Sequence, residues 1–234
     1  MRILIACECS QTVCAEFREL GVESKTFPSI AKAIATQHTE FLRRKLVRKI
    51  CIDPGHGGIH PGACYFGEKE KNLTLRISEM LRSVLLEAGH KVTMTRHNDV
   101  DMSLTDRCRI ANRDKSNLFI SIHCNASYNK SAFGPEMYYW HTSTSGQLVA
   151  RSIMEELHKL TGCNARKYIK NSSFTTLRRT LMPSIVAECG YMSNEDEFNK
   201  LCTTTHQYLI VQGIVRGINN YFRLTMLNKE EDMR

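Results

Sequence analysis

Between residues 47 and 222, apolar positions follow two alternating patterns along the chain. Short apolar runs are typical of buried strands, and apolar residues at steps of three and four are typical of helices that face a core. The predicted strands are 47–53, 91–95, 118–123, 136–140 and 184–187, and the predicted helices are 73–88, 103–115, 148–160 and 208–222. Strands that alternate with helices indicate an α/β fold with a mixed, largely parallel sheet flanked by helices on both faces.

Local signals mark the ends of two of these helices. Ser103 with Asp106 three residues later resembles a capping box, in which side chains bond to the free amides of the first turn. Gly89 follows the last apolar position of the helix 73–88 and is a natural stop. The patterns and the end signals therefore agree over this part of the chain.

A shorter segment precedes the alternating region. It contains a strand-like run at 2–7, an apolar helical pattern over 13–20 and a basic helix-like stretch at 30–45. A segment of this size rarely buries a sufficient core, so we expect it to pack poorly or to be partly disordered. We divide the chain into an N-terminal extension of unknown role (1–46), a main domain (47–224) and a charged C-terminal tail (225–234).

Composition limits the class of protein and the kind of partner. Hydrophobic residues make up 42% of the chain and charged residues 24%, which is typical of a globular protein. The net charge of +8 favours a polyanionic partner, which could be nucleic acid, an acidic membrane surface or a cell-wall polymer. No run approaches the ~18 apolar residues of a membrane span. Glu8 interrupts the N-terminal apolar run, which is too short for a secretory signal, so we expect synthesis in the cytoplasm and no membrane anchor.

The ten cysteines do not form a disulfide pattern. Cys51, Cys124 and Cys189 lie inside apolar runs, and no Cys-x-x-Cys pair suggests a zinc ribbon or a redox motif. A free cysteine commonly serves as a small hydrophobic residue in a protein core. We therefore expect reduced thiols in a reducing compartment.

Candidate chemistry gathers at the carboxyl ends of the predicted strands, where active groups of open α/β sheets tend to lie. His56, His123 and Glu188 occupy three such ends, and Glu70 or its neighbour Glu68 precedes the first long helix. Two histidines and a carboxylate are a common catalytic zinc set that leaves a position open for water. A further carboxylate that does not bind the metal can act as general base, and Glu188 suits that role by position. A single histidine is more often structural, and spacing alone leaves the choice between Glu68 and Glu70 open.

Residues 48–222 resemble the zinc-dependent N-acetylmuramoyl-L-alanine amidases of the amidase 3 type, which occur in cell-wall remodelling enzymes and phage endolysins. The motifs that carry this resemblance follow one another in family order. They are IDPGHGG at 52–58, PGA at 61–63, EKNLTLRISEML at 70–81, LLEAGHKVTMTR at 85–96, SLTDRCRIAN at 103–112, LFISIHCNAS at 118–127 and LRRTLMPSIVAECGYMSN at 177–194.

The resemblance implies zinc held by His56, Glu70 and His123, with Glu188 as the catalytic acid and base. It favours Glu70 over Glu68, because only Glu70 keeps Leu73 in the register of the family motif. The implied reaction is hydrolysis of the amide bond between N-acetylmuramic acid and L-alanine in peptidoglycan.

The implied biological role is that of a phage or prophage endolysin that acts on the cell wall after release from the cytoplasm, and we expect a monomer. A bacterial autolysin or sporulation amidase of the same chemistry is the alternative, as is a catalytically silent wall-binding relative. The opening residues are similar to the start of phage DNA cytosine methyltransferases, but that family's catalytic motifs are absent. No nucleic-acid-binding pattern is present, so we expect no nucleic-acid partner.

Several residues depart from the family pattern or have two interpretations. Cys124 and Cys189 replace commoner residues beside the predicted site, and they either point into the core or act as stray metal ligands. Asp53 either bonds a ligand histidine or caps the glycine-rich turn. Asn125 and Arg178 either line the substrate groove or lie near it. The remaining histidines lack a motif and are treated as ordinary, namely His60, His90, His97, His141, His158 and His206.

Overall fold

The computed structural model describes residues 47–163, 168–170 and 174–231. Contacts within the chain separate Met1–Leu46 from Val47–Arg234. The elements predicted for 2–7, 13–20 and 30–45 lie outside the described residues. Everything that follows concerns the unit that begins at Val47.

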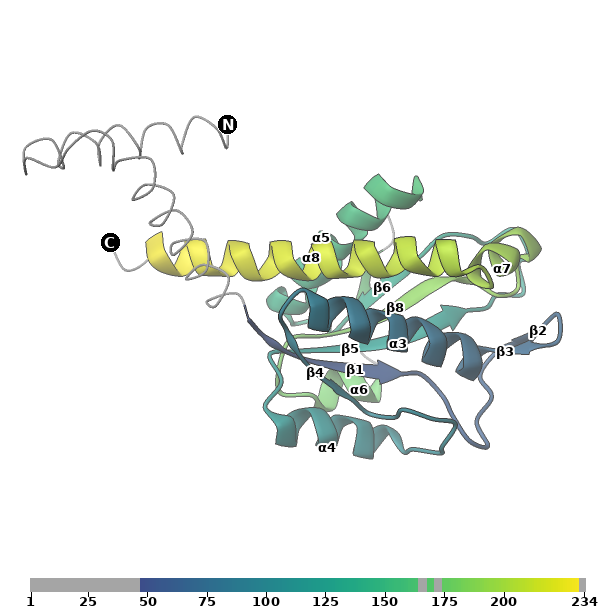
Figure 1. The fold of residues 1–234 in the computed structure, drawn as a ribbon, viewed down its shortest axis with the longest axis horizontal. Helices are drawn as coiled ribbons and strands as arrows, with labels where there is room; N and C mark the ends of the chain where they lie inside the picture. The colour runs from purple at the N-terminus through teal and green to yellow at the C-terminus, as the bar shows by residue number, and fades with distance from the viewer. Residues whose placement is uncertain (1–46, 164–167, 171–173, 232–234) are drawn as a thin grey trace, which may run out of the picture. The chain divides into compact units, whose positions relative to one another are not determined.

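A six-stranded sheet forms the centre of this unit (Figure 1). In spatial order its strands are β4 (Lys91–Met94), β1 (Lys49–Pro54), β5 (Leu118–Asn125), β8 (Ser184–Tyr191), β6 (Glu136–Tyr139) and β7 (Tyr168–Lys170). Strand β6 is antiparallel to β8, and every other neighbouring pair is parallel. The prediction of a mixed, largely parallel sheet is confirmed.

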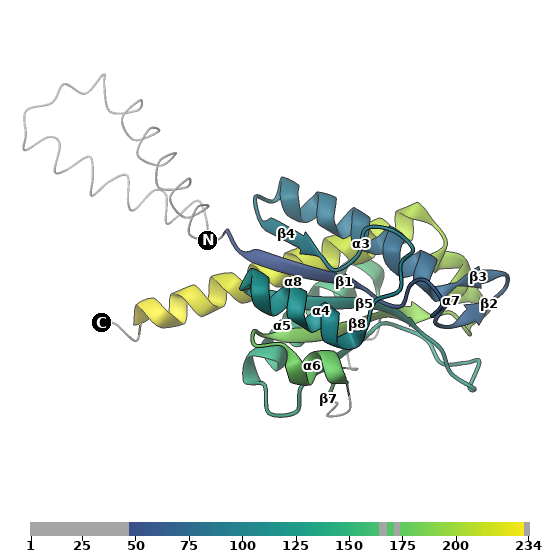
Figure 2. The ribbon, with the colours of Figure 1, turned by 90° about the horizontal axis from the view of Figure 1, so that it is seen from below.

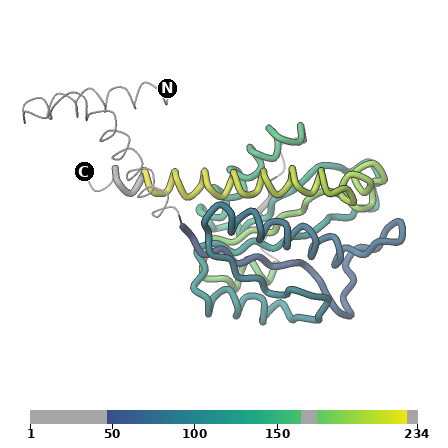
Figure 3. The backbone as a smooth tube through the Cα atoms, viewed as in Figure 1, coloured from purple at the N-terminus to yellow at the C-terminus, as the bar shows by residue number. Residues whose placement is uncertain are grey.

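Helices cover both faces of the sheet, as predicted. One face carries α3 (Glu70–Glu87), α5 (Thr144–Thr161) and α8 (Thr204–Glu231), and the other carries α4 (Leu104–Asp114) and α6 (Thr175–Arg179) (Figures 1 and 2). The hairpin β2 (Cys64–Tyr65) and β3 (Glu68–Lys69) lies at the same end of the unit as α7 (Glu195–Leu201) (Figure 3). That end is the one toward which β1, β5 and β8 run.

Strand alternation separates the core from the chemistry. Cys51 and Phe119 pack with Ala111 of α4, so the odd-numbered positions of β1 and β5 face α4 and α6. Asp53 and His123 are further along that same face. The even-numbered positions of the two strands are buried against the opposite helical layer. On this face of the sheet, side chains near the starts of β1 and β5 form apolar packing, and side chains near their ends are ionisable.

Several predicted boundaries were wrong. Strands β5 and β8 continue to Asn125 and Tyr191, because their parallel pairing extends past His123 and Glu188 through a bulge. His123, predicted as the last residue of its strand, and Glu188, predicted to follow its strand, therefore both lie inside strands. Helix α8 continues to Glu231 and takes in most of the predicted tail, where no proline or glycine interrupts it.

The predicted N-cap of α4 is confirmed, since Ser103 Oγ accepts a hydrogen bond of 3.1 Å from Asp106 N. The Asp106 carboxylate accepts a hydrogen bond from Ser103 Oγ at 2.6 Å. Among the described helices, none has the length and apolar character needed to cross a bilayer.

Candidate metal centre and catalytic cavity

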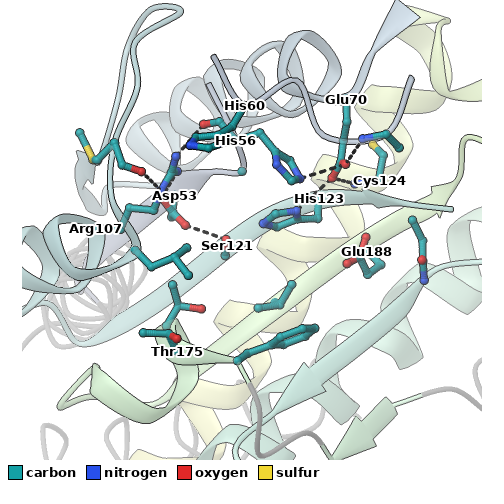
Figure 4. Close-up of a pocket in the computed structure, with 18 of the residues that line it drawn as sticks. Asp53, His56, His60, Glu70, Arg107, Ser121, His123, Cys124, Thr175 and Glu188 are labelled. Atoms are coloured by element: carbon teal, nitrogen blue, oxygen red, sulfur yellow. Dashed lines mark hydrogen bonds and ion pairs between the residues drawn. The ribbon is translucent and has the colours of Figure 1, made fainter. Parts of the chain in front are cut away.

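Three side chains from separate elements meet at the carboxyl end of the sheet. His56 follows β1, Glu70 begins α3 and His123 lies on β5. Glu70 Oε2 is 3.0 Å from His56 Nε2, and Glu70 Oε1 is 2.9 Å from His123 Nδ1. One donor atom from each residue falls within 4.8 Å of the other two. Figure 4 shows the three side chains pointing toward one another. This is a His-Glu-His group that could hold one metal ion.

Glu70 and not Glu68 takes the central place. Besides the two histidines, Glu70 accepts hydrogen bonds from the backbone amides of Ala63 and Cys124, at 2.9 and 3.0 Å. Glu68 instead bonds to Asn72 and to Arg76. The four contacts fix the orientation of the Glu70 carboxylate, so both of its oxygens are aimed at the histidines.

Close packing around the group leaves no room for larger residues. A Cβ atom on Gly55 would lie 2.4 Å from the His123 ring, and one on Gly62 would lie 2.5 Å from Glu70 Oε2. His56 has a φ of 60°, a left-handed conformation that is uncommon for residues other than glycine. Such strain persists only where the surrounding structure imposes it, and it is concentrated at functional sites.

Two buried arginines hold the strained turn. Arg107 donates to Pro54 O and His56 O, both at 2.6 Å. Arg96 donates to Pro54 O at 3.0 Å and to Gly55 O at 2.8 Å. Neither arginine was identified from the sequence. Together they satisfy the carbonyls of the turn and hold the backbone that carries His56.

Asp53 is the ion-pair partner of Arg107, and both interpretations of it from sequence were wrong. It accepts hydrogen bonds from Thr95 at 2.6 Å, Arg107 at 2.8 Å and Ser121 at 2.7 Å, and it is 1% exposed. It bonds neither a site histidine nor the glycine turn in the described contacts. Its role is to neutralise Arg107 beneath the turn.

Replacing Arg107 with methionine should lower the free energy of unfolding by about 3–5 kcal/mol, because Asp53 would keep a buried charge without a partner. Arg109→Met is the matched control, since Arg109 pairs with Asp106 on the surface with 68% of its side chain exposed. It should cost less than about 1 kcal/mol. Urea denaturation of both variants measures the difference, and equal losses would contradict the assigned role of Arg107.

The site shifts the proton affinities of its members. Burial alone would raise the pKa of Glu70, but hydrogen bonds with both histidines hold it well below its usual range. Burial alone would lower the pKa of His123, but the hydrogen bond to Glu70 and the nearby carboxylates raise it to about 9. Without a metal, the group is thus a carboxylate bridging two imidazoles, with His123 protonated at neutral pH.

Glu188 lies beside the group on β8, paired in register with His123. Its Oε2 atom is buried and has no hydrogen-bond partner among the described residues. Burial raises the pKa of Glu188 to about 7, the carboxylates of Glu70 and Glu136 act in the same direction, and His123 opposes them. An unpartnered buried carboxyl is costly, which marks it as a functional group.

A second buried acid, Glu136, stands next to Glu188 on the antiparallel strand β6. It accepts hydrogen bonds from the hydroxyl groups of Tyr138 and Tyr191, both at 2.8 Å, and from Asn125 Nδ2 at 3.2 Å. The sequence placed Glu136 in a strand but did not indicate this network. The network orients Asn125 at the wall of the cavity.

The site opens into a cavity of about 610 Å³, the catalytic cavity. Its floor is the sheet face with Ser121 and Glu188, and its walls come from the starts of α4 and α6 (Figure 4). Asn125 lines the cavity, and so does His60, to which the sequence analysis assigned no functional role. Arg178 is exposed on α6 and is not among the lining residues. The cavity can therefore accept a ligand considerably larger than water.

The two cysteines beside the site are buried, in agreement with the core interpretation, although Cys124 also lines the catalytic cavity. Cys124 is 1% exposed and Cys189 is 3% exposed, and neither belongs to the His-Glu-His group. Burial raises the pKa of both thiols. All seven described cysteines are free thiols. Within the described residues, the donor atoms of the clustered site are therefore imidazole nitrogens and carboxylate oxygens.

Comparison with known proteins agrees with the fold. Residues 50–220 match the Amidase_3 family, described as N-acetylmuramoyl-L-alanine amidase. The chain belongs to this family.

Individual relatives give the same result. The chain is 35% identical over 180 residues to the N-acetylmuramoyl-L-alanine amidase CwlM of Bacillus licheniformis, covering 76% of this chain and 70% of that protein. It is 32% identical over 181 residues to the probable cell wall amidase LytH of Staphylococcus saprophyticus, covering 75% of this chain but only 58% of that longer protein. The crystal structure of an N-acetylmuramoyl-L-alanine amidase from Clostridium difficile 630 superposes with a TM-score of 0.72 at 31% identity, covering 75% of this chain and 96% of that one.

Proposed function

We propose that this protein is a zinc-dependent amidase that hydrolyses the bond between the lactyl group of N-acetylmuramic acid and L-alanine in peptidoglycan. Family membership supports the reaction, and the named relatives are amidases of this type. The observation that carries the proposal is geometric. A His-Glu-His group lies within 4.8 Å at the end of the sheet, and a separate buried carboxyl stands in register beside it.

The residues present fit zinc. Two imidazole nitrogens and one carboxylate are a donor set found in catalytic zinc sites, and a three-ligand site keeps a position open. The buried Glu188 Oε2 without a hydrogen-bond partner lies next to this set and is free to bond to a reactant. When bound, zinc would supply a Lewis acid that polarises the scissile carbonyl and makes water acidic near neutral pH.

The chain's own residues handle the proton. Glu188 accepts it from the attacking water and donates it to the amine nitrogen of L-alanine as the tetrahedral intermediate collapses. A pKa of about 7 suits a group that must both accept and return a proton at neutral pH. Asn125, held by Glu136, presents an amide to the substrate at the cavity wall. The arginine-bound turn keeps His56 in place during the reaction.

Digestion of purified cell wall tests the reaction itself. The zinc-loaded protein should release free L-alanine amino termini, and chelation should stop the release. New reducing sugars in place of amino termini would identify a glycosidase and reject the proposal. A protein with no zinc and no lytic activity would instead favour the catalytically silent relative.

Zinc affinity should fall as the pH is lowered from about 9 to 7, by about tenfold per pH unit for each proton displaced. The sign follows from His123, whose pKa of about 9 means that it carries a proton at pH 7 and must lose it to bind a metal. Glu70 adds nothing to this slope, because its pKa lies well below this range. Competition with a chelator at several pH values, corrected for the chelator's own protonation, gives the slope. A flat profile would contradict the protonated state of His123.

The biological setting is a separate proposal, because an endolysin and an autolysin share this chemistry. We infer an endolysin that is made in the cytoplasm and acts on the wall after release, with a bacterial autolysin or sporulation amidase as the alternative. One relative is named a sporulation-specific amidase, whereas the fold is shared at 21% identity with the catalytic domain of an endolysin. Expression in host cells with and without a membrane-permeabilising partner separates the two. Lysis that requires permeabilisation supports the endolysin, and lysis without it supports an exported autolysin.

A further inference from the structure

A second cavity of about 720 Å³ lies at the end of the unit that carries the hairpin β2–β3 and α7. Tyr65 and Phe66 of the hairpin line one side, and Lys130 with Ser131 line another. The remaining lining residues come from the segment that leads into α7 and are Ser193, Asn194, Glu195 and Asp196. None of these residues takes part in the His-Glu-His group or in the proton transfer assigned to Glu188.

Two chain segments that line the catalytic cavity also lead to residues that line the second cavity. Ala63 and Ala126 line the catalytic cavity, and Tyr65 and Lys130, a few residues further along the same segments, line the second one. We propose that the second cavity binds the glycan strand of peptidoglycan next to the sugar whose lactyl group is cleaved. The inference rests on the proposed amidase function, because that function makes a polymer of N-acetylated sugars the substrate.

The chemistry of the lining fits a neutral sugar. A pyranose ring has apolar C–H faces that can pack on aromatic rings, and hydroxyl and acetamido groups that need hydrogen-bond partners. Tyr65 and Phe66 supply rings, with centroids 6.2 Å apart, and Phe66 is 56% exposed. Asn194, Glu195 and Asp196 supply acceptors for hydroxyl groups. One lysine against two carboxylates gives no positive surface that would select an anionic polymer.

Contacts within the protein support the aromatic side of the cavity. Lys130 Nζ lies 4.4 Å from the centre of the Tyr65 ring, a cation–π contact, and 3.4 Å from its hydroxyl. Phe66 packs on Phe198 of α7, with ring centroids 4.9 Å apart. Rigid tyrosine and phenylalanine side chains lose little conformational entropy when they bind.

Phe66 also breaks a local rule of hairpin turns. Phe66 and Gly67 form the two-residue loop with φ values of 49° and 83°. Loops with two positive φ values favour Asn-Gly or Asp-Gly, and a bulky residue there is strained. A half-exposed aromatic ring kept at a strained position indicates a binding role in addition to its packing on Phe198.

The probe is chitotetraose, a neutral tetramer of N-acetylglucosamine without lactyl group or peptide, titrated into the zinc-loaded full chain by calorimetry. Wild type should bind it saturably, and Tyr65→Ala and Phe66→Asn should each weaken binding about tenfold. Phe66→Asn removes the contact with Phe198 but relieves the strain of the turn, so its melting temperature should stay close to that of wild type. Tyr208→Ala is the control, since Tyr208 is 50% exposed on α8 and lines neither cavity.

The kinetics of hydrolysis of intact cell wall give a second readout. Both hairpin variants should raise KM for intact cell wall about tenfold while kcat stays the same. Wild type that does not bind chitotetraose up to about 10 mM, or binding that survives both substitutions, would overturn the proposal. Binding of the free stem peptide, lost in both variants, would assign the cavity to peptide and overturn it as well. Because sugar binding requires no turnover, a protein that binds chitotetraose but releases no alanine would refute only the amidase.

Discussion

Glu188→Gln should lose activity on purified cell wall by roughly 10²–10⁴-fold and still bind zinc with unchanged affinity. Glutamine keeps the size of the side chain but can neither take a proton from water nor return one to the departing amine. Glu188 is not one of the three residues whose donor atoms meet, so the metal group remains complete. The measurement combines release of L-alanine amino termini with zinc content from the same preparation.

Glu155→Gln provides the control for this variant, because Glu155 lies on the exposed surface of α5 with 59% of its side chain accessible. It should retain full activity. A Glu188→Gln protein that turns over at the wild-type rate would remove Glu188 from the mechanism. Loss of zinc together with activity would instead make Glu188 part of the metal site.

Glu70→Ala should abolish both zinc binding at micromolar concentrations and hydrolysis. The binding free energy of zinc at a structural site with four ligands is about 10–16 kcal/mol. One ligand is therefore worth roughly 3–4 kcal/mol, which is about 10²–10³-fold in affinity. The loss should be at the upper end here, because Glu70 also orients both histidines. Zinc affinity by competition with a chelator and wall hydrolysis measure the two effects.

Glu68→Gln tests whether the neighbouring carboxylate, and not Glu70, is the metal ligand. Glu68 lies two residues earlier and bonds to Asn72 and Arg76, away from the histidines. We expect this variant to keep its zinc and its activity. If Glu68→Gln lost the metal and Glu70→Ala kept it, the assignment of the carboxylate would be reversed.

The regular part of the fold was predictable because its signals are long and periodic. The apolar pattern of α3 over 73–85 and the buried runs of β1 and β5 decide element type without any tertiary information. The boundaries were not predictable in the same way. The first turn of α3 contains Glu70, Lys71 and Asn72 and has no apolar period, so the helix was predicted to begin at Leu73. Pairing with neighbouring strands, which no local pattern reports, extends β8 to Tyr191.

Short elements gave almost no signal. The hairpin β2–β3 has two residues per strand, too few for an alternation to show. Helix α7 has only seven residues, but the sequence contains a signal for its first turn. Asn194 caps it by accepting from Glu197 N at 3.2 Å, the spacing of a capping box.

The residues that form the candidate site were predictable from the sequence. The contacts of the buried charged residues that hold the turn before His56 were not. Histidine, glutamate and a family motif indicate metal chemistry through residue type alone. Arg96 and Arg107 were not identified, and Asp53 was assigned the wrong partners, because charged residues in a sequence are normally interpreted as solvated. Their burial follows from the carbonyls of a strained turn that only the folded backbone brings into reach.

The most direct test of the central claim is an anomalous-difference map from a crystal of the zinc-loaded protein, recorded at the zinc absorption edge. We predict one strong peak within about 2.0–2.2 Å of His56 Nε2, His123 Nδ1 and a Glu70 oxygen, with the Glu188 carboxyl beside it but not bound. A peak at a cysteine, or no peak between the two imidazoles, would contradict the account.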